Sequence, residues 1–360
     1  MKGLLHETKG FRPLYFHQDA LYGAKGDRIY RTRDLGLTTE FVCELKRPAA
    51  HKAADRLELW RRLLRLDVYR MRILRDETLI MSFKGGIFVS SPGSVEANPS
   101  FKITRGSRPV SLAIDDDQQV VFGEYFSNPE RGPVNIYRTS DGGQSWQIAH
   151  QFPSKSIRHV HGISYDRWEN CFWICTGDYN DENQLLRAST DFSDIRVMRQ
   201  GGQSNRFYFL QIFENAIVTA TDTPLEPNYI TVIDKRTMTA DKVAGIENTN
   251  FYGCEVNGRI FMSTNAEPSA VNDTRSSHLW MGDLDCGIWQ RILSFRTDWV
   301  DRMTYLPAIP PGLFQYPRIF FPEGHNTTGK LVCYAMGLKG HHGRMMVFDP
   351  TAFDGEPPIQ

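Results

Sequence analysis

The stretch Val120-Val121-Phe122-Gly123-Glu124-Tyr125 is the second of four apolar runs in the clearest copy of a repeating unit, Pro109–Phe152. A polar loop over residues 127–132 follows it. The third run is Val134–Arg138, and the fourth begins at Trp146. Short apolar runs that alternate with turn and loop residues are typical of antiparallel strands. The unit therefore predicts four short strands within about 45 residues.

The same order of strand, polar loop and strand recurs along the chain. The second and third strands of the later copies fall at residues 172–178 and 185–189, 216–222 and 229–234, 259–265 and 278–282, and 318–323 and 331–335. Weaker copies lie near residues 20–31 and 78–89. A repeat of about 40–50 residues with four strands is typical of a propeller blade. We expect an all-β protein, a β-propeller of about seven four-stranded blades, with six blades as the alternative.

Two segments depart from the repeat. Residues 52–67 place leucines and a tryptophan at helical spacing with charges between them, which predicts a short helical insertion. This helix would pack on the outside of the propeller or bind a partner. Residues 351–360 are polar and rich in proline, so we expect a loose C-terminal tail. Residues 1–350 would then form a single propeller domain.

The charge of the chain is balanced, with 42 Lys and Arg against 42 Asp and Glu among 360 residues. A neutral chain has no general field that attracts nucleic acid or a membrane surface, so neither is expected as a partner. No apolar run approaches the roughly 18 residues of a membrane helix. Residues 1–9 lack the apolar region of a signal peptide, and the six cysteines form no CxxC pair. We expect a soluble cytoplasmic protein with reduced thiols, or one exported with a leader since removed; the oligomeric state is not indicated.

The segment Thr139-Ser140-Asp141-Gly142-Gly143-Gln144-Ser145-Trp146 follows the pattern S/T-x-D-x-G-x-S/T-W. In such a turn Asp141 can accept backbone N–H bonds, the glycine permits positive φ, and the tryptophan packs between sheets. Partial copies occur at residues 32–38 and 189–194, at the same place in their units. With this motif the sequence resembles the sialidase-like β-propeller superfamily, whose turns are called Asp-boxes or BNR repeats. The resemblance implies that the motif lies opposite the active site and marks the fold rather than the chemistry.

The resemblance does not extend to sialidase activity. True sialidases of this superfamily carry an Arg-Ile-Pro motif near the start of the chain and three arginines that hold a carboxylate. This sequence has no Arg-Ile-Pro, and Arg12-Pro13 is a poor substitute. A shared fold does not by itself imply a shared activity.

Two sets of loops would lie on the opposite, functional face: those from second to third strand, and those that lead into the next blade. Both sets are rich in charged and aromatic residues. We expect the catalytic residues to be Glu124, His159, His161, Asp178 and Asp222. We expect the substrate to contact Tyr125, Arg158, Arg206, Glu267, Arg302, Glu323 and His325. A ring of carboxylates, histidines and arginines suits a sugar or a polar polymer.

His159 and His161 are the most specific pair in these loops. They stand two residues apart at the start of a strand, so their side chains face the same way. They could act as a general base, bind a sugar carboxylate together with Arg158, ligate a metal, or form a structural pair. A metal site would need further ligands nearby, and Glu323 and His325 have the same spacing. No metal or other cofactor is expected.

Three classes of function remain. A glycoside hydrolase would use paired carboxylates roughly 5–9.5 Å apart, and it comes first because acidic residues outnumber histidines in these loops. A polysaccharide lyase acting on a uronate polymer would use His159, His161, Tyr125 and Arg158. Several lyase families that are propellers are similar in using His, Tyr and Arg residues. A propeller that binds a glycan or a protein without catalysis is the third class.

Overall fold

The computed structural model describes residues 1–48, 58–272, 275–284, 287–299 and 315–354. The chain divides into two compact units. Unit 1 comprises Met1–Asp67 and Val243–Gln360, and unit 2 comprises Val68–Lys242. That residues 1–350 form one domain stays a prediction.

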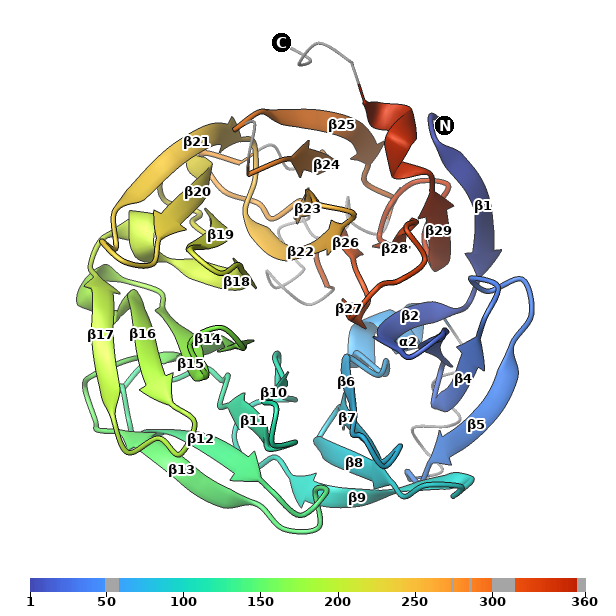
Figure 1. Cartoon of the computed structure of the whole chain (residues 1–360), viewed down its shortest axis with the longest axis horizontal. Coiled ribbons are helices and arrows are strands. Elements are labelled where there is room, and N and C mark those ends of the chain that lie inside the picture. The colour runs from blue at the N-terminus through green and yellow to red at the C-terminus, as the bar shows by residue number, and fades with distance from the viewer. Residues whose placement is uncertain (49–57, 273–274, 285–286, 300–314, 355–360) are drawn as a thin grey trace. The chain divides into compact units, whose positions relative to one another are not determined.

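Unit 2 contains four antiparallel sheets, and in each the strands lie in chain order (Figure 1). The first two sheets consist of β6 (Arg70–Ile73), β7 (Leu79–Phe83), β8 (Gly86–Ser90) and β9 (Glu96–Lys102), and of β10 (Ala113–Ile114), β11 (Val120–Gly123), β12 (Val134–Thr139) and β13 (Gln147–Phe152). The other two consist of β14 (His159–Asp166), β15 (Cys171–Gly177), β16 (Gln184–Ser189) and β17 (Ile195–Gln200), and of β18 (Phe207–Ile212), β19 (Ala216–Thr221), β20 (Asn228–Asp234) and β21 (Ala240–Ile246). The 3-10 turns η1 (Asn180–Glu182) and η2 (Gln203–Asn205) lie in the loops.

Unit 1 contributes three more four-stranded sheets among its described residues. They consist of β2 (Arg12–His17), β3 (Ala20–Lys25), β4 (Arg28–Thr32) and β5 (Glu40–Leu45); of β22 (Asn250–Val256), β23 (Arg259–Thr264), β24 (Ser276–Gly282) and β25 (Trp289–Arg296); and of β26 (Arg318–Phe320), β28 (Leu331–Met336), β29 (Arg344–Phe348) and β1 (Leu4–Lys9). In the last sheet the N-terminal strand β1 pairs with β29 near the C-terminus. The short strand β27 (Glu323–Gly324) runs parallel to β2.

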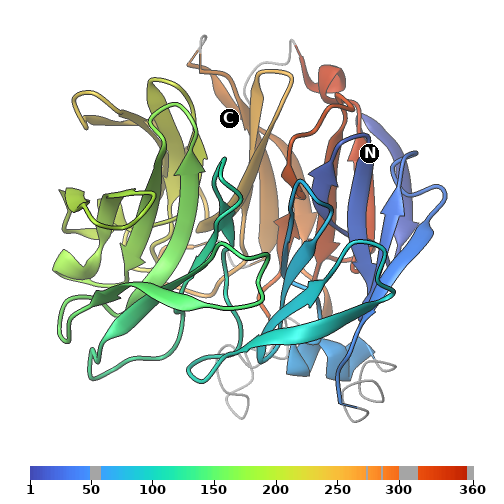
Figure 2. The same ribbon diagram turned by 60° about the horizontal axis from the view of Figure 1, so that its bottom comes forward.

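The sheets follow from the alternation of apolar and polar residues. Strand β15 is buried along its whole length, whereas the outer strand β17 is partly exposed throughout. Apolar side chains of neighbouring sheets pack against each other, as in the core formed by Val121, Ile136, Ile163, Phe172 and Ile174. The twist of these antiparallel strands is visible in Figure 2. The predicted all-β propeller fold is confirmed, with several four-stranded sheets among the described residues.

The helical insertion expected at residues 52–67 is present as helix α2 (Glu58–Leu64), and residues 52–57 lie outside the described part of the chain. Arg62 of this helix is buried and donates to Asp298, with 2.6 Å between Nη1 and Oδ2. Within the expected tail, Pro350–Phe353 form the 3-10 turn η3 and Phe353 is buried, while residues 355–360 lie outside the description. No helix among the described residues is long and apolar enough to cross a membrane.

The Thr139–Trp146 segment joins the third and fourth strands of its sheet. Asp141 accepts the Ser145 N–H at 3.0 Å and the Thr139 hydroxyl at 2.7 Å. Burial alone would raise the pKa of Asp141, but the hydrogen bonds from Ser145 and Thr139 outweigh it and lower the pKa to about 2. The Trp146 ring packs 5.1 Å from that of Phe122, between two sheets. The segment is therefore a hydrogen-bonded turn that fixes the connection between β12 and β13.

The segment at residues 32–38 forms the same kind of hydrogen-bonded turn between β4 and β5. Asp34 accepts the Thr38 N–H at 2.9 Å and the Thr32 hydroxyl at 2.8 Å. The Thr38 hydroxyl and N–H lead the contacts that lower the pKa of Asp34 to about 2. The Gly36 N–H donates to the Thr32 hydroxyl, as the Gly143 N–H does to Thr139. The two turns thus share one hydrogen-bond pattern although the sequence of the second is degenerate.

Candidate functional site

The candidate site in unit 2 lies where β14 begins and β15 ends. His159 and His161 open β14, and Asp178 is the residue after β15. In the antiparallel pair, His159 stands opposite Gly177, so the hairpin places the Asp178 carboxylate beside the histidines. The register shifts between Val160 and Gly162, which makes His161 the extra residue of a β-bulge. The bulge re-aims the His161 ring.

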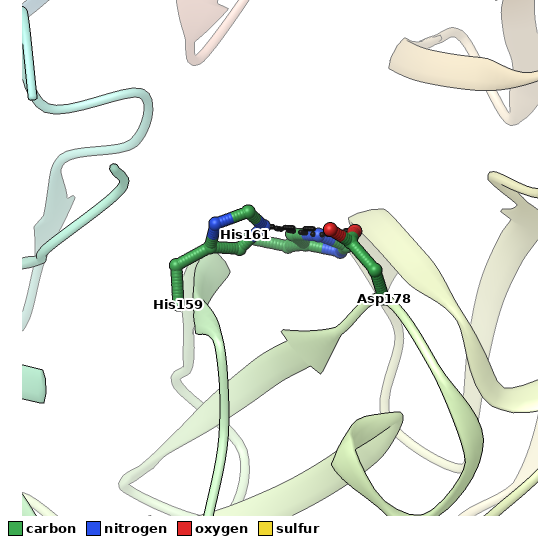
Figure 3. A group of neighbouring side chains, drawn as sticks. All are labelled: His159, His161 and Asp178. Carbon is green, nitrogen blue, oxygen red and sulfur yellow. Dashed lines mark hydrogen bonds and ion pairs between the residues drawn. The ribbon is translucent and has the colours of Figure 1, made fainter. Parts of the chain in front are cut away.

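The three side chains converge through their terminal atoms (Figure 3). The two histidine Nε2 atoms are 3.0 Å apart. The Asp178 Oδ1 atom lies 3.0 Å from the His161 Nε2 and 3.6 Å from the His159 Nε2. All three side chains are at least nine-tenths buried. They form a tight polar cluster with little access to bulk water.

Backbone carbonyls hold the opposite side of each imidazole ring. The His159 Nδ1 lies 3.0 Å from the carbonyl oxygen of Phe126, and the His161 Nδ1 lies 3.0 Å from that of Phe207. Phe207 stands at the start of β18, whose register with β19 is also irregular there. Burial lowers the pKa of His161, and the negative charge of the neighbouring Asp178 carboxylate opposes this effect only in part.

Two arginines bind the Asp178 carboxylate from the other side. Arg158 Nη1 donates to Oδ2 at 2.8 Å, and Arg206 Nη2 lies 3.0 Å from Oδ1. Arg206 also reaches Asp222, with 3.6 Å between Nε and Oδ2. Burial alone would raise the pKa of Asp178, but its contacts with the histidines and Arg206 hold the pKa well below its usual range. Asp178 is therefore ionised and cannot donate a proton.

Two tyrosines flank the histidines. The Tyr125 ring centroid lies 4.2 Å from that of His159, and the Tyr208 ring centroid lies 5.8 Å from that of His161. Tyr125 is partly exposed, as is the Arg158 side chain at 26%. These two side chains connect the buried cluster with the solvent.

Glu124 was expected to be catalytic, and the structure shows both of its carboxylate oxygens in use. Arg105 Nε donates to Oε1 at 3.0 Å, and the Arg105 Nη2 contacts Oε2. The backbone N–H of Asn135 donates to Oε2 at 2.8 Å. These contacts tie Glu124 to its own sheet and to the preceding loop.

The structure brings most of the expected residues of unit 2 into one connected group: Tyr125, Arg158, His159, His161, Asp178, Arg206 and Asp222. Glu267, Glu323 and His325 belong to unit 1, which is described by itself. Arg302 lies outside the described residues. Sequence reasoning missed Tyr208 and the two carbonyl groups that bind the histidines. Tyr208 could have been found from the repeat, because it lies in the first strand of the next unit. The two backbone carbonyl groups leave no mark in the sequence.

No protein-family model matches this chain, and no curated protein matches it either. Solved structures match it over nearly its whole length. An oligogalacturonate lyase in complex with manganese is 11% identical, with a TM-score of 0.59, and the match covers 98% of this chain and 95% of the lyase. An ancestral GH74 enzyme is 11% identical, with a TM-score of 0.56, over 95% of this chain and 45% of that one.

The extracellular domain of a B. thetaiotaomicron protein described as a hybrid two-component system is also 11% identical. Its TM-score is 0.55, and the match covers 94% of this chain. This chain spans about two fifths of that domain, since 39% of it is covered. At such low identity these similarities establish the fold, and the chemistry must be argued from the side chains.

Proposed function

We propose that the protein is a glycan-active enzyme that cleaves a uronate-containing polysaccharide or oligosaccharide by elimination. The observation that carries the proposal is the position of Asp178. It is ionised and held between Arg158, Arg206 and two buried histidines, with the Tyr125 ring packed at a tilt against that of His159. This arrangement supplies positive charge and a proton-transfer group, which are the two needs of an elimination next to a carboxylate.

Hydrolysis, which the sequence placed first, is less well supported by the same side chains. A glycoside hydrolase needs one carboxyl group that carries a proton to the leaving oxygen. Asp178 has a lowered pKa, and Glu124 is bound to Arg105 and to a backbone N–H. Asp222 lies 3.6 Å from the Arg206 guanidinium. The carboxylates expected in unit 2 are thus placed as acceptors.

The elimination can be written with the residues of this site. Arg158 and Arg206 would bind the uronate carboxylate through guanidinium N–H groups and so acidify the adjacent C5 proton. Tyr125, reacting as its phenolate, would take that proton and become a neutral phenol, and the C5–H electron pair would form the C4=C5 double bond. The bond from C4 to the glycosidic oxygen would break, and this oxygen would leave as an alcohol after receiving a proton from the same tyrosine. No water is consumed.

Two of the similar structures bear on this proposal. The oligogalacturonate lyase matches along almost the full length of both chains, which supports elimination from a uronate oligomer. The ancestral GH74 enzyme supports hydrolysis as the second candidate. We also propose that the chain is related to the Asp-box propellers of the sialidase-like superfamily. The shared hydrogen-bond pattern of the turns at Asp34 and Asp141 supports that relation.

The proposal is tested by incubating the protein with a panel of uronate polysaccharides and following two signals. Elimination produces the ultraviolet absorbance of an unsaturated uronate together with new reducing ends, whereas hydrolysis produces reducing ends alone. We expect Tyr125→Phe to lower kcat by about 10²–10⁴-fold, the usual contribution of a proton-transfer group. Tyr165→Phe is the matched control, because Tyr165 is a partly exposed tyrosine of β14 that bonds Asn170.

Reducing ends without absorbance would replace elimination by hydrolysis. Binding of a glycan without either signal would identify a binding module. Full activity of a folded Tyr125→Phe protein would refute the role of Tyr125.

A further inference from the structure

We propose that His159, His161 and Asp178 bind a divalent transition-metal ion through two Nε2 atoms and one carboxylate oxygen. The basis is the convergence of three acceptor atoms at one buried point (Figure 3). The metal site stands on this geometry alone. Only its coupling to a uronate substrate, described below, rests on the proposed function.

The backbone fixes which nitrogen of each ring carries the proton. A carbonyl oxygen can only accept a hydrogen bond, so the Nδ1 atoms of His159 and His161 must donate to Phe126 and Phe207. A neutral imidazole with a proton on Nδ1 has a bare lone pair on Nε2. Metal-binding histidines use this arrangement, with the outer ring N–H held by a carbonyl or carboxylate.

When both rings are neutral, three lone-pair atoms therefore face one another without a hydrogen between them. The two Nε2 atoms and the Asp178 Oδ1 lie 3.0–3.6 Å apart. Such a cluster needs a cation at its centre. A proton on the His161 Nε2 could serve either the carboxylate or the His159 nitrogen, because one N–H bond points in one direction. A metal ion serves all three atoms together.

The spacing also fits a coordination sphere. Metal–nitrogen and metal–oxygen bonds of about 2.1 Å place two ligand atoms about 3.0 Å apart at a right angle and about 3.4 Å apart at a tetrahedral angle. The three separations, 3.0, 3.0 and 3.6 Å, bracket these values. Imidazole and carboxylate together suit zinc, manganese, iron and related ions. Three protein ligands on one side leave positions open for substrate.

A second group of ligand-type atoms in the described residues provides a contrast. Asp166, Glu169 and Cys171 also lie close together. There the Lys235 ammonium supplies the cation, at 2.6 Å from the Asp166 Oδ2 and 3.2 Å from the Glu169 Oε1. At the histidine cluster the nearby cations are the guanidinium groups of Arg158 and Arg206, which contact the Asp178 carboxylate. In this second group the lysine ammonium takes the place that we propose for a metal ion among the two histidines and Asp178.

The charge of the site then points to the substrate. Arg158 and Arg206 already balance Asp178 and Asp222, and Arg206 shares the same Oδ1 atom that would ligate the metal. A divalent ion would leave the site with excess positive charge. A carboxylate on the substrate would neutralise it, so metal and uronate should bind with positive coupling.

The test uses the full chain, stripped of metal by a chelator and dialysed. Titration with Mn²⁺ is followed by the loss of the free-ion electron paramagnetic resonance signal, and titration with Zn²⁺ by calorimetry. We expect saturation at a single ion per chain and spin-echo modulation from histidine nitrogen in the wild-type Mn²⁺ complex. His159→Gln and Asp178→Asn should each weaken binding by at least about tenfold. The control His150→Gln changes a partly buried histidine outside the cluster and should leave binding unchanged.

Spin-echo data on the wild type keep the proposal testable if a variant fails to fold. Absence of saturable binding of both ions, or bound Mn²⁺ without histidine nitrogen coupling, would overturn it. Unchanged affinity in a folded His159→Gln protein would overturn it as well. Metal binding without elimination would retain the site and refute the lyase, so the two failures are distinguishable.

Discussion

Replacement of Asp141 by Asn separates the turn that stabilises the fold from the residues proposed to act on substrate. The carboxylate accepts a backbone N–H and two hydroxyls, and its pKa falls from the ordinary 3.8 to about 2. That difference corresponds to at most about 2.5 kcal/mol of stability. The side chain is exposed, so solvent screening reduces the expected loss on Asp141→Asn to about 1 kcal/mol.

The loss should depend on pH in one direction. Because the folded-state pKa of Asp141 lies below the unfolded one, its stabilising contribution is fully present above about pH 4. It decreases as the pH falls from about 4 through 2 and is gone only below that, where the carboxylate is protonated in both states. Urea unfolding followed by tryptophan fluorescence should therefore show a constant difference between wild type and Asp141→Asn from neutral pH down to about pH 5, and a shrinking difference below it.

The exposed Glu130, changed to Gln, is the control and should alter neither stability nor its pH dependence. Enzymatic activity of Asp141→Asn should equal that of the wild type, because the turn lies between β12 and β13 and makes no contact with the histidine cluster. Equal stability of the two proteins at neutral pH, or a difference that grows in acid, would refute the reasoning. Loss of activity in the folded variant would refute the purely structural role of the turn.

Three further substitutions or reactions follow from buried groups of unit 2. Asp166→Asn should cost about 1.5–3 kcal/mol in urea unfolding, because it removes the carboxylate charge 2.6 Å from the buried Lys235 ammonium and leaves the Glu169 carboxylate, at 3.2 Å, to balance it; a loss below about 0.5 kcal/mol would contradict this. Gly162→Ala should cost about 1–3 kcal/mol, because the new Cβ would stand 2.5 Å from the carbonyl oxygen of Tyr208, and an unchanged melting temperature would show that the strands can move apart. Cys171 should react with iodoacetamide at mildly alkaline pH roughly a hundredfold more slowly than an exposed cysteine, because burial raises the pKa of its thiol to about 11; rapid labelling followed by mass spectrometry would contradict it.

Local patterns were sufficient to predict the sheets and the ends of their strands. Glu124 and Asp178 each follow a buried second strand, and His159 opens the first strand of its sheet, as the repeat indicated. The turns at Asp34 and Asp141 could be found for the same reason, since their hydrogen bonds join residues two to four positions apart.

Contacts that depend on register and on side-chain reach could not be predicted in this way. The meeting of Asp178 with both histidines depends on the pairing of His159 with Gly177 and on the bulge at His161. The sequence of β14 does not indicate whether the strand is regular or bulged at this position. The contact between Glu124 and Arg105 depends on the long arginine side chain, which reaches the carboxylate from a separate loop. The sequence therefore indicated where a carboxylate lies but not whether an arginine already binds it.

Mass spectrometry of the products from one defined uronate oligosaccharide tests the central claim most directly. Elimination at the site of Asp178 and Tyr125 predicts two fragments whose masses sum to that of the substrate, one of them unsaturated at its new non-reducing end. Asp178→Asn, checked for folding by circular dichroism, should yield neither fragment, while Tyr165→Phe should yield both. Fragments whose masses sum to the substrate plus one water would contradict elimination, and unchanged cleavage by folded Asp178→Asn would contradict the assignment of the site.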